Sequence, residues 1–83
     1  MEDRLKFQAE SYKFNYSKLL GRIKEICGKQ SVFAAAMELS ERSVSLKLNN
    51  QRGWTQVEMH RACEVLKFSE LEIPNYFFVE TEE

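Results

Sequence analysis

The sequence predicts one small all-α domain, a bundle of four to five helices with a short extended C-terminal tail. Apolar residues recur at three- and four-residue spacing between residues 15 and 73, where alternation of period two is nearly absent. Only three glycines and one proline occur, and they stand between the helical segments. The chain has 83 residues, 43% of them hydrophobic, which suffices for one domain with one core.

The first helix is expected between residues 15 and 27. Asn15 is a favourable N-cap residue, and Phe14 before it can pack on Leu19 as a hydrophobic staple. Gly28 ends this helix, because glycine adopts a left-handed backbone conformation without steric cost. The expected apolar stripe consists of Leu19, Leu20, Ile23, Ile26 and Cys27.

Two short helices follow, over residues 30–37 and 41–49, with a turn of three or four residues between them. Ala34 is small where the two helices must touch, Leu39 is apolar in the turn, and Ser40 can cap the second helix. This arrangement is a central helix-turn-helix. The inward anchors of its second helix are Val44 and Leu48.

A fourth helix begins at Thr55. Thr55 and Glu58 have the spacing of a capping box, and Trp54 can pack on Met59 as a staple. The expected inward stripe of this helix is Met59, Ala62, Cys63 and Leu66.

The C-terminal part is expected to be irregular. Residues 69–76 predict one or two helical turns interrupted by Pro74. Residues 77–79 are expected to be extended, and the acidic end at residues 80–83 is expected to be frayed.

Residues 1–13 are interpreted as an N-terminal arm before a domain of residues 14–79. Leu5, Phe7 and Ala9 alternate with polar residues, which allows a strand. An arm that reaches toward DNA and a frayed or foreign segment stay equally open.

The outward face of the second short helix carries side chains that suit the major groove of DNA. Arg42 can bind guanine in a bidentate way, Ser45 can bind several base edges, and Leu46 can contact a thymine methyl group. Each good bidentate pair contributes about 1–3 kcal/mol of base discrimination. The amide-rich loop at residues 49–53 suits phosphate contacts that set the register.

The pattern of Gln30, Ala34, Leu39, Ser40 and Val44 resembles the phage repressor and Cro-like helix-turn-helix proteins of the lambda-repressor-like type. The stretch SERSVSLKLNNQRGWTQVE is similar to a family of small phage-encoded, Cro-like DNA-binding proteins of Gram-positive hosts. The resemblance covers about residues 14 to 79. It implies base reading by Glu41, Arg42, Ser45 and Leu46, and backbone or flanking contacts by Gln30, Ser43, Lys47, Asn49, Asn50 and Arg52.

The sequence departs from this family at two places. Glu38 stands in the turn where the family usually has glycine, and a left-handed conformation there would cost roughly 1 kcal/mol. Lys29 stands where a serine or threonine cap is common.

The net charge of -1 argues against DNA binding when it is taken as a total. Residues 68–83, however, hold five glutamates and no lysine or arginine. The other 67 residues hold 12 basic and 8 acidic groups, a net charge of +4. The total therefore does not exclude a DNA-binding surface on the main part of the chain.

Other classes of function are not indicated. The single histidine and the lack of a glycine-rich phosphate loop predict no enzyme and no cofactor. Cys27 and Cys63 are 36 residues apart, which is neither a metal-binding spacing nor a disulfide framework. His60 and Cys63 could share a metal ion, but two ligands make no closed site. No apolar run is long enough to span a bilayer.

The leading hypothesis is a sequence-specific DNA-binding transcriptional regulator of phage or prophage origin in the bacterial cytoplasm. Its partner would be double-stranded operator DNA, bound as a homodimer through the aromatic IPNYFFV segment. The alternatives are an antirepressor or modulator that binds another phage repressor protein, and an antitoxin with the same fold.

Overall fold

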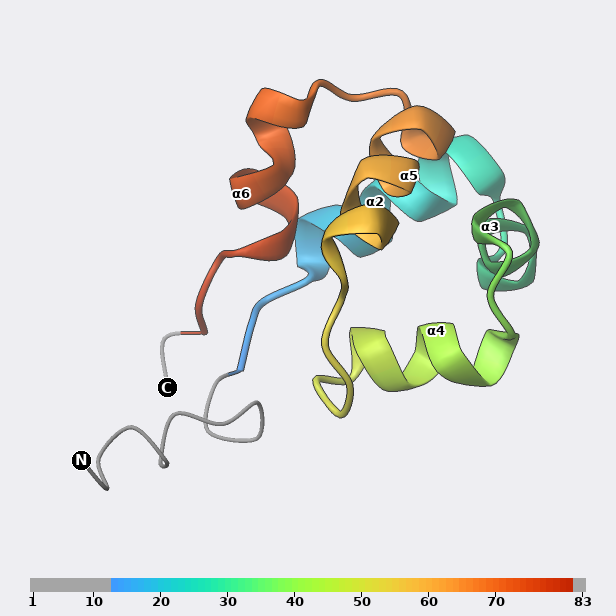
Figure 1. Ribbon diagram of the computed structural model, residues 1–83, viewed down its shortest axis with the longest axis horizontal. Helices are drawn as coiled ribbons and strands as arrows, with labels where there is room; N and C mark the ends of the chain where they lie inside the picture. The colour runs from blue at the N-terminus through green and yellow to red at the C-terminus, as the bar shows by residue number, and fades with distance from the viewer. Residues whose placement is uncertain (1–12, 82–83) are drawn as a thin grey trace.

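The computed structural model describes residues 13–81 and shows the expected small all-helical bundle (Figure 1). Helices α2, α5 and α6 contact one another, and α3 contacts α2, α4 and α5. Helix α4 lies at one edge of the bundle, which it joins through α3 (Figure 1). The elements in chain order are α2 (Ser17–Cys27), α3 (Gln30–Met37), α4 (Glu41–Leu48), α5 (Gln56–Leu66), the 3-10 turn η2 (Glu70–Glu72) and α6 (Ile73–Phe77).

The core lies where α2, α3, α5 and α6 meet, and α4 contributes Val44 to it. In α2, Leu19 and Ile23 are buried as expected, but Leu20 and Ile26 are exposed. The buried stripe of α2 is therefore narrower than predicted: Leu20 is turned about 100° from Leu19 around the helix axis, and Ile26 lies in the last turn of the helix. The fully buried large side chains are Leu19, Phe33, Met37, Val44, Leu66 and Phe77.

Local signals position the helix ends. Gly28 has a φ of 82° and donates its N–H to the carbonyl groups of Ile23 and Lys24. Ser40 accepts the N–H of Ser43, which caps α4. The capping box between Thr55 and Glu58 is present in both directions. These predicted helix ends are confirmed.

The start of α2 differs from the prediction by one position. Tyr16, not Asn15, is the N-cap residue, and α2 begins at Ser17. The Asn15 side chain instead accepts the backbone N–H of Ser17 at 2.9 Å. The amide still satisfies a free donor at the helix start, which is the physical role that the sequence assigned to it.

The turn between α3 and α4 contains the strained position that was expected. Glu38 has φ 62° and ψ 37°, a left-handed conformation that glycine adopts at lower cost. The end of α3 is secured from another element, because Arg61 of α5 donates to the carbonyl oxygen of Met37 at 3.1 Å.

Lys47 is buried, with 4% of its surface exposed, so the expectation that it lies on an outward flank of α4 is wrong. Its Nζ atom lies 3.0 Å from Oε1 of Glu58 and donates to the carbonyl oxygen of Gly53 at 2.8 Å. It also lies 5.7 Å from the centre of the Trp54 ring. A buried charge needs such partners, and they are available only on the inner side of α4.

The pKa of Glu58 reflects this network. Burial raises the pKa of the Glu58 carboxyl, but hydrogen bonds from the Thr55 backbone and from Lys47, together with the Lys47 charge, outweigh burial. The net result is a pKa below the ordinary value. The carboxylate is therefore the stable form in the folded chain.

The two ends of the described chain lie side by side (Figure 1). Asn15 donates its N–H to the carbonyl oxygen of Val79 at 2.6 Å, and Thr81 donates to that of Lys13 at 3.1 Å. The expected frayed end is therefore paired at residues 80 and 81, whereas residues 82–83 lie outside the described part. Phe77 belongs to α6, so the extended tail begins one residue later than predicted.

The arm predicted at residues 1–13 lies outside the described residues except for Lys13. No helix within residues 13–81 is long and apolar enough to cross a membrane.

Replacing Glu38 with glycine tests the strain in the turn. Glu38→Gly should raise the free energy of unfolding by about 0.5–1 kcal/mol, because the left-handed conformation no longer opposes a side chain. Urea denaturation measures this change. Glu38→Ala is the control, since it removes the charge and keeps the Cβ atom. An equal gain in Glu38→Ala would assign the effect to the charge.

Replacing Glu58 with glutamine tests the buried ion pair. Glu58→Gln should lower the free energy of unfolding at pH 7 by roughly 2–4 kcal/mol, because Lys47 stays buried without its counter-charge. The folded pKa of Glu58 is depressed, so its contribution is complete above the ordinary value of about 4.3.

Acidification should therefore reduce the difference between wild type and Glu58→Gln as the pH falls through the folded pKa. Denaturant titrations between neutral and acidic pH measure it. Glu64→Gln on the exposed side of α5 is the matched control and should leave the pH dependence unchanged. A difference that stays constant down to low pH would contradict the assignment.

Candidate interaction surfaces

The outward face of α4 carries the predicted base-reading residues. Glu41 and Arg42 are exposed, whereas Ser45 and Leu46 are half-buried. Gln30 is exposed at the first position of α3. The structure thus places these side chains on the surface, and Arg42 is the one exposed cation of α4.

Several predicted backbone-contacting residues are engaged within the chain. Asn49 donates its side-chain amide to the carbonyl oxygen of Ser45 at 2.8 Å. Arg52 is exposed, and its Nη1 donates to the Ser43 hydroxyl at 3.3 Å. Both contacts are on the surface, so they are weak and open to exchange with a ligand.

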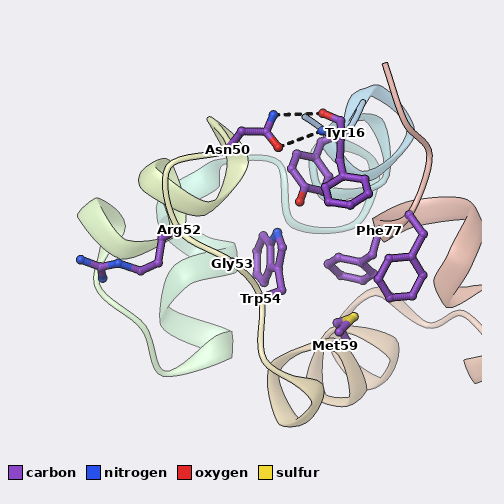
Figure 2. A pocket seen from close by; sticks show the side chains of 9 residues that line it. Tyr16, Asn50, Arg52, Gly53, Trp54, Met59 and Phe77 are labelled. Atoms are coloured by element: carbon purple, nitrogen blue, oxygen red, sulfur yellow. Dashed lines mark hydrogen bonds between the residues drawn. The ribbon is translucent and has the colours of Figure 1, made fainter. Parts of the chain in front are cut away.

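Asn50 has a structural role that the sequence did not indicate. Its Oδ1 accepts the N–H of Phe14 at 2.9 Å, and its Nδ2 donates to the Phe14 carbonyl oxygen at 3.0 Å (Figure 2). The amide thus imitates a neighbouring β-strand and ties the loop after α4 to the paired chain ends. The phosphate contact at Asn50 stays a prediction, while in the structure each group of this amide already has one partner at Phe14.

An aromatic pocket lies between this loop and the chain ends, with a volume of about 200 Å³. Tyr16, Trp54 and Phe77 converge on it with Met59 beside them, whereas the side chain of Arg52 points away (Figure 2). The rings of Trp54 and Phe77 meet edge to face with centroids 5.2 Å apart. The lining residues are Phe14, Tyr16, Asn50, Arg52, Gly53, Trp54, Met59, Phe77 and Phe78.

One polar atom of this pocket, Nε1 of Trp54, has no hydrogen-bond partner among the described residues. This atom is buried, and it faces the Tyr16 hydroxyl without making a hydrogen bond of good geometry (Figure 2). Burial raises the pKa of that hydroxyl, and the nearby Trp54 indole offsets part of the rise. A buried donor without an acceptor is uncommon in protein interiors and often marks a functional site.

A groove between α5 and α6 continues the apolar surface. It has a volume of about 410 Å³ and shares Met59 and Phe78 with the aromatic pocket. Phe78 is 49% exposed, which is unusual for a ring between two hollows. We call the apolar residues that line the open side of these two hollows the apolar face: Phe14, Met59, Ile73 and Phe78.

Sequence reasoning assigned Trp54, Tyr76, Phe77 and Phe78 to the core or to a dimer surface. Tyr76 and Phe77 are buried, which confirms the core assignment for these two. Trp54 packs against the core and, together with Phe77 and the exposed Phe78, lines the aromatic pocket. The signal that could have revealed the pocket is the concentration of aromatic residues near both chain ends, at residues 14–16 and 76–78.

Metal-binding and cysteine chemistry add no site. No group of three or more histidine, cysteine, aspartate or glutamate side chains suited to a metal ion occurs in residues 13–81. Cys27 and Cys63 are both free thiols.

A protein of known structure is similar to this chain. The chain is similar to the modulator of repression (MOR) of the temperate bacteriophage TP901-1 from Lactococcus lactis, whose solution structure superposes with a TM-score of 0.72. The two sequences are 51% identical, and the match covers 82% of this chain and 92% of that chain. No curated protein matches the chain.

The family described as a protein of unknown function (DUF739) matches residues 12–80, which is most of the chain. The chain therefore belongs to this family.

Proposed function

We propose that this protein regulates phage repression by binding a repressor protein through its apolar face. The main support for this proposal is the contrast between the face of α4 and the apolar face. The face of α4 keeps few free charges, whereas the apolar face exposes Phe78 beside two connected hollows. The likeness to a protein named a modulator of repression supports the same function.

The α4 face is a weak surface for DNA. Proteins bind phosphates with lysine and arginine side chains, and each contact contributes to affinity through counterion release. Lys47 is removed from this role by burial, and Glu41 places a negative charge beside Arg42. The net charge of the exposed part of α4 is therefore close to zero, which gives little attraction for a duplex.

The apolar face is a strong surface for a protein. Interface hot spots are aromatic and lie in well-packed hollows from which water is excluded. Phe78 meets this description, because it borders both the aromatic pocket and the α5–α6 groove. Exposed apolar surface that is continuous across two hollows is typical of an interaction site.

The origin and location of the protein follow from the same proposal. Because the proposed partner is the repressor of a temperate phage, we infer that this chain is a phage or prophage product. It would act where that repressor acts, in the cytoplasm of the bacterial host. The bacteriophage source of the similar solved structure supports this origin.

Direct DNA binding as a Cro-like homodimer is the second candidate function. The observation that favours it is the pair α3 and α4, joined by a tight turn, with Arg42 exposed and Ser45 and Asn49 beside it. Dimerisation through the IPNYFFV segment would compete with repressor binding, because Phe78 belongs to that segment. The antitoxin alternative is favoured by no observation in the structure.

Substitution of Phe78 tests the apolar face. The repressor of the same phage should bind the wild-type chain, and Phe78→Ser should weaken binding by at least about 10-fold, since a central aromatic anchor is lost. Isothermal titration calorimetry measures the dissociation constant. Val32→Ser is the matched control, because Val32 is similarly exposed but lies on α3. Repressor binding that is absent in the wild type would refute the proposed function.

Selection of bound DNA from a random pool tests the second candidate. At a stated salt concentration of about 0.15 M, we expect the wild-type chain to recover no consensus, because the α4 face lacks phosphate-binding charges. Recovery of a pseudo-palindrome, lost in Arg42→Ala without a change in helicity or melting, would establish direct DNA reading instead.

A further inference from the structure

The α5–α6 groove has a charged edge. His60 lines the groove, and its Nδ1 atom lies 3.0 Å from Oε2 of Glu70 in η2. The carboxylate of Glu70 therefore stands at the rim of the groove. Glu64 is on α5 one turn after His60, and Glu72 directly precedes Ile73, which also lines the groove. We call Glu64, Glu70 and Glu72 the acidic edge.

The geometry at this edge rests on the contact between His60 and Glu70 and on the position of Glu64 one turn after His60. The electrostatics of the neighbouring thiol agree with it: burial raises the pKa of Cys63, and the charges of Glu70, Glu64 and Glu72 raise it further.

Within residues 13–81 the acidic edge forms no ion pair with a lysine or arginine. Among residues 13–81, neither Glu64 nor Glu72 takes part in an ion pair, and Glu70 contacts only the imidazole of His60. Arginine side chains that could neutralise the edge are used elsewhere: Arg22 binds the carbonyl oxygens at the end of α5, and Arg61 binds that of Met37. The field of the three carboxylates therefore extends into solvent beside the groove.

An exposed leucine projects from the middle of this edge. Leu71 is 88% exposed and stands between Glu70 and Glu72. The turn that carries it is ordered, because Leu71 donates its N–H to the Ser69 hydroxyl at 3.1 Å and Glu72 donates to the Ser69 carbonyl oxygen at 2.8 Å. The exposed Leu71 thus lies between two glutamates in a turn that hydrogen bonds hold in place.

We propose that the α5–α6 groove binds an apolar helix of the repressor that carries lysine or arginine on its flank. This inference rests on the proposed function and names the chemistry of the partner segment. The groove supplies apolar contact area through Met59, Ile73 and Phe78, and the acidic edge pairs with the basic flank. Helices that lie in grooves between other helices bind in this way.

Charge complementarity selects this occupant over the others. Nucleic acid phosphates and acidic peptides are repelled by three carboxylates that form no ion pair with a lysine or arginine of residues 13–81. A neutral apolar segment would fill the groove but gain nothing from the edge. A second copy of this chain is the remaining alternative, because α2 carries Lys18, Arg22 and Lys24.

Association kinetics with the purified repressor test the inference. Complementary charges act mainly on the association rate and weaken with salt. We expect the association rate of the wild-type chain to fall as salt is raised. Glu64→Lys combined with Glu70→Lys should lower it about 10-fold at low ionic strength, with little change in dissociation. Both residues are exposed, so circular dichroism and melting should stay unchanged.

Glu25→Lys is the matched control for Glu64→Lys, because both glutamates are exposed on helices and Glu25 lies on α2 beside a different hollow. The control should keep the wild-type association rate. Equal rates in the control and in the acidic-edge variants would overturn the inference while leaving repressor binding intact. A wild-type chain that does not bind the repressor would instead refute the proposed function.

Sedimentation of the chain alone completes the test. A monomer at all concentrations is the expected result. A dimer that dissociates in the double variant would assign the groove to a second copy of the chain and overturn the inference.

Discussion

The buried ammonium group of Lys47 is the contact on which the position of α4 depends. It joins α4 to the first turn of α5 through Glu58, and to the loop between them through the carbonyl oxygen of Gly53. Removing such a charge from water costs several kcal/mol unless its partners are in place. Lys47, Glu58 and the Gly53 carbonyl group must therefore come together as the protein folds. Because Glu58 also closes the capping box with Thr55, one network sets the end of α4 and the start of α5.

The contrast between local and long-range signals explains which parts of the fold could be predicted from the sequence. Gly28, Ser40 and Thr55 act on backbone groups a few residues away, so their roles as helix ends follow from sequence order alone. The partner of Asn50 is 36 residues away at Phe14, and no periodicity reports such a contact. The outward position predicted for Lys47 is wrong for a similar reason. A lysine beside an outward helix face is usually solvated, and only the approach of α5 supplies Glu58, the carboxylate that allows this lysine to be buried.

The aromatic pocket illustrates the same limit for the candidate site. Its walls come from three segments: the chain start at Phe14, the loop at Trp54 and the end of α6 at Phe77. The aromatic character of each segment is visible in the sequence and predicts burial. Whether the rings close completely or leave a hollow depends on how far apart the segments are held, and that spacing is set partly by the Asn50 amide.

The polar groups used inside the fold decide where the protein can interact. Two side chains that secure the loop after α4 are engaged within the fold: Lys47 is buried, and the Asn50 amide is hydrogen-bonded to Phe14. The same contacts hold Phe14 and Trp54 around the aromatic pocket. The backbone geometry of α3 and α4 therefore does not decide by itself which face binds a partner, since function belongs to the site and not to the fold.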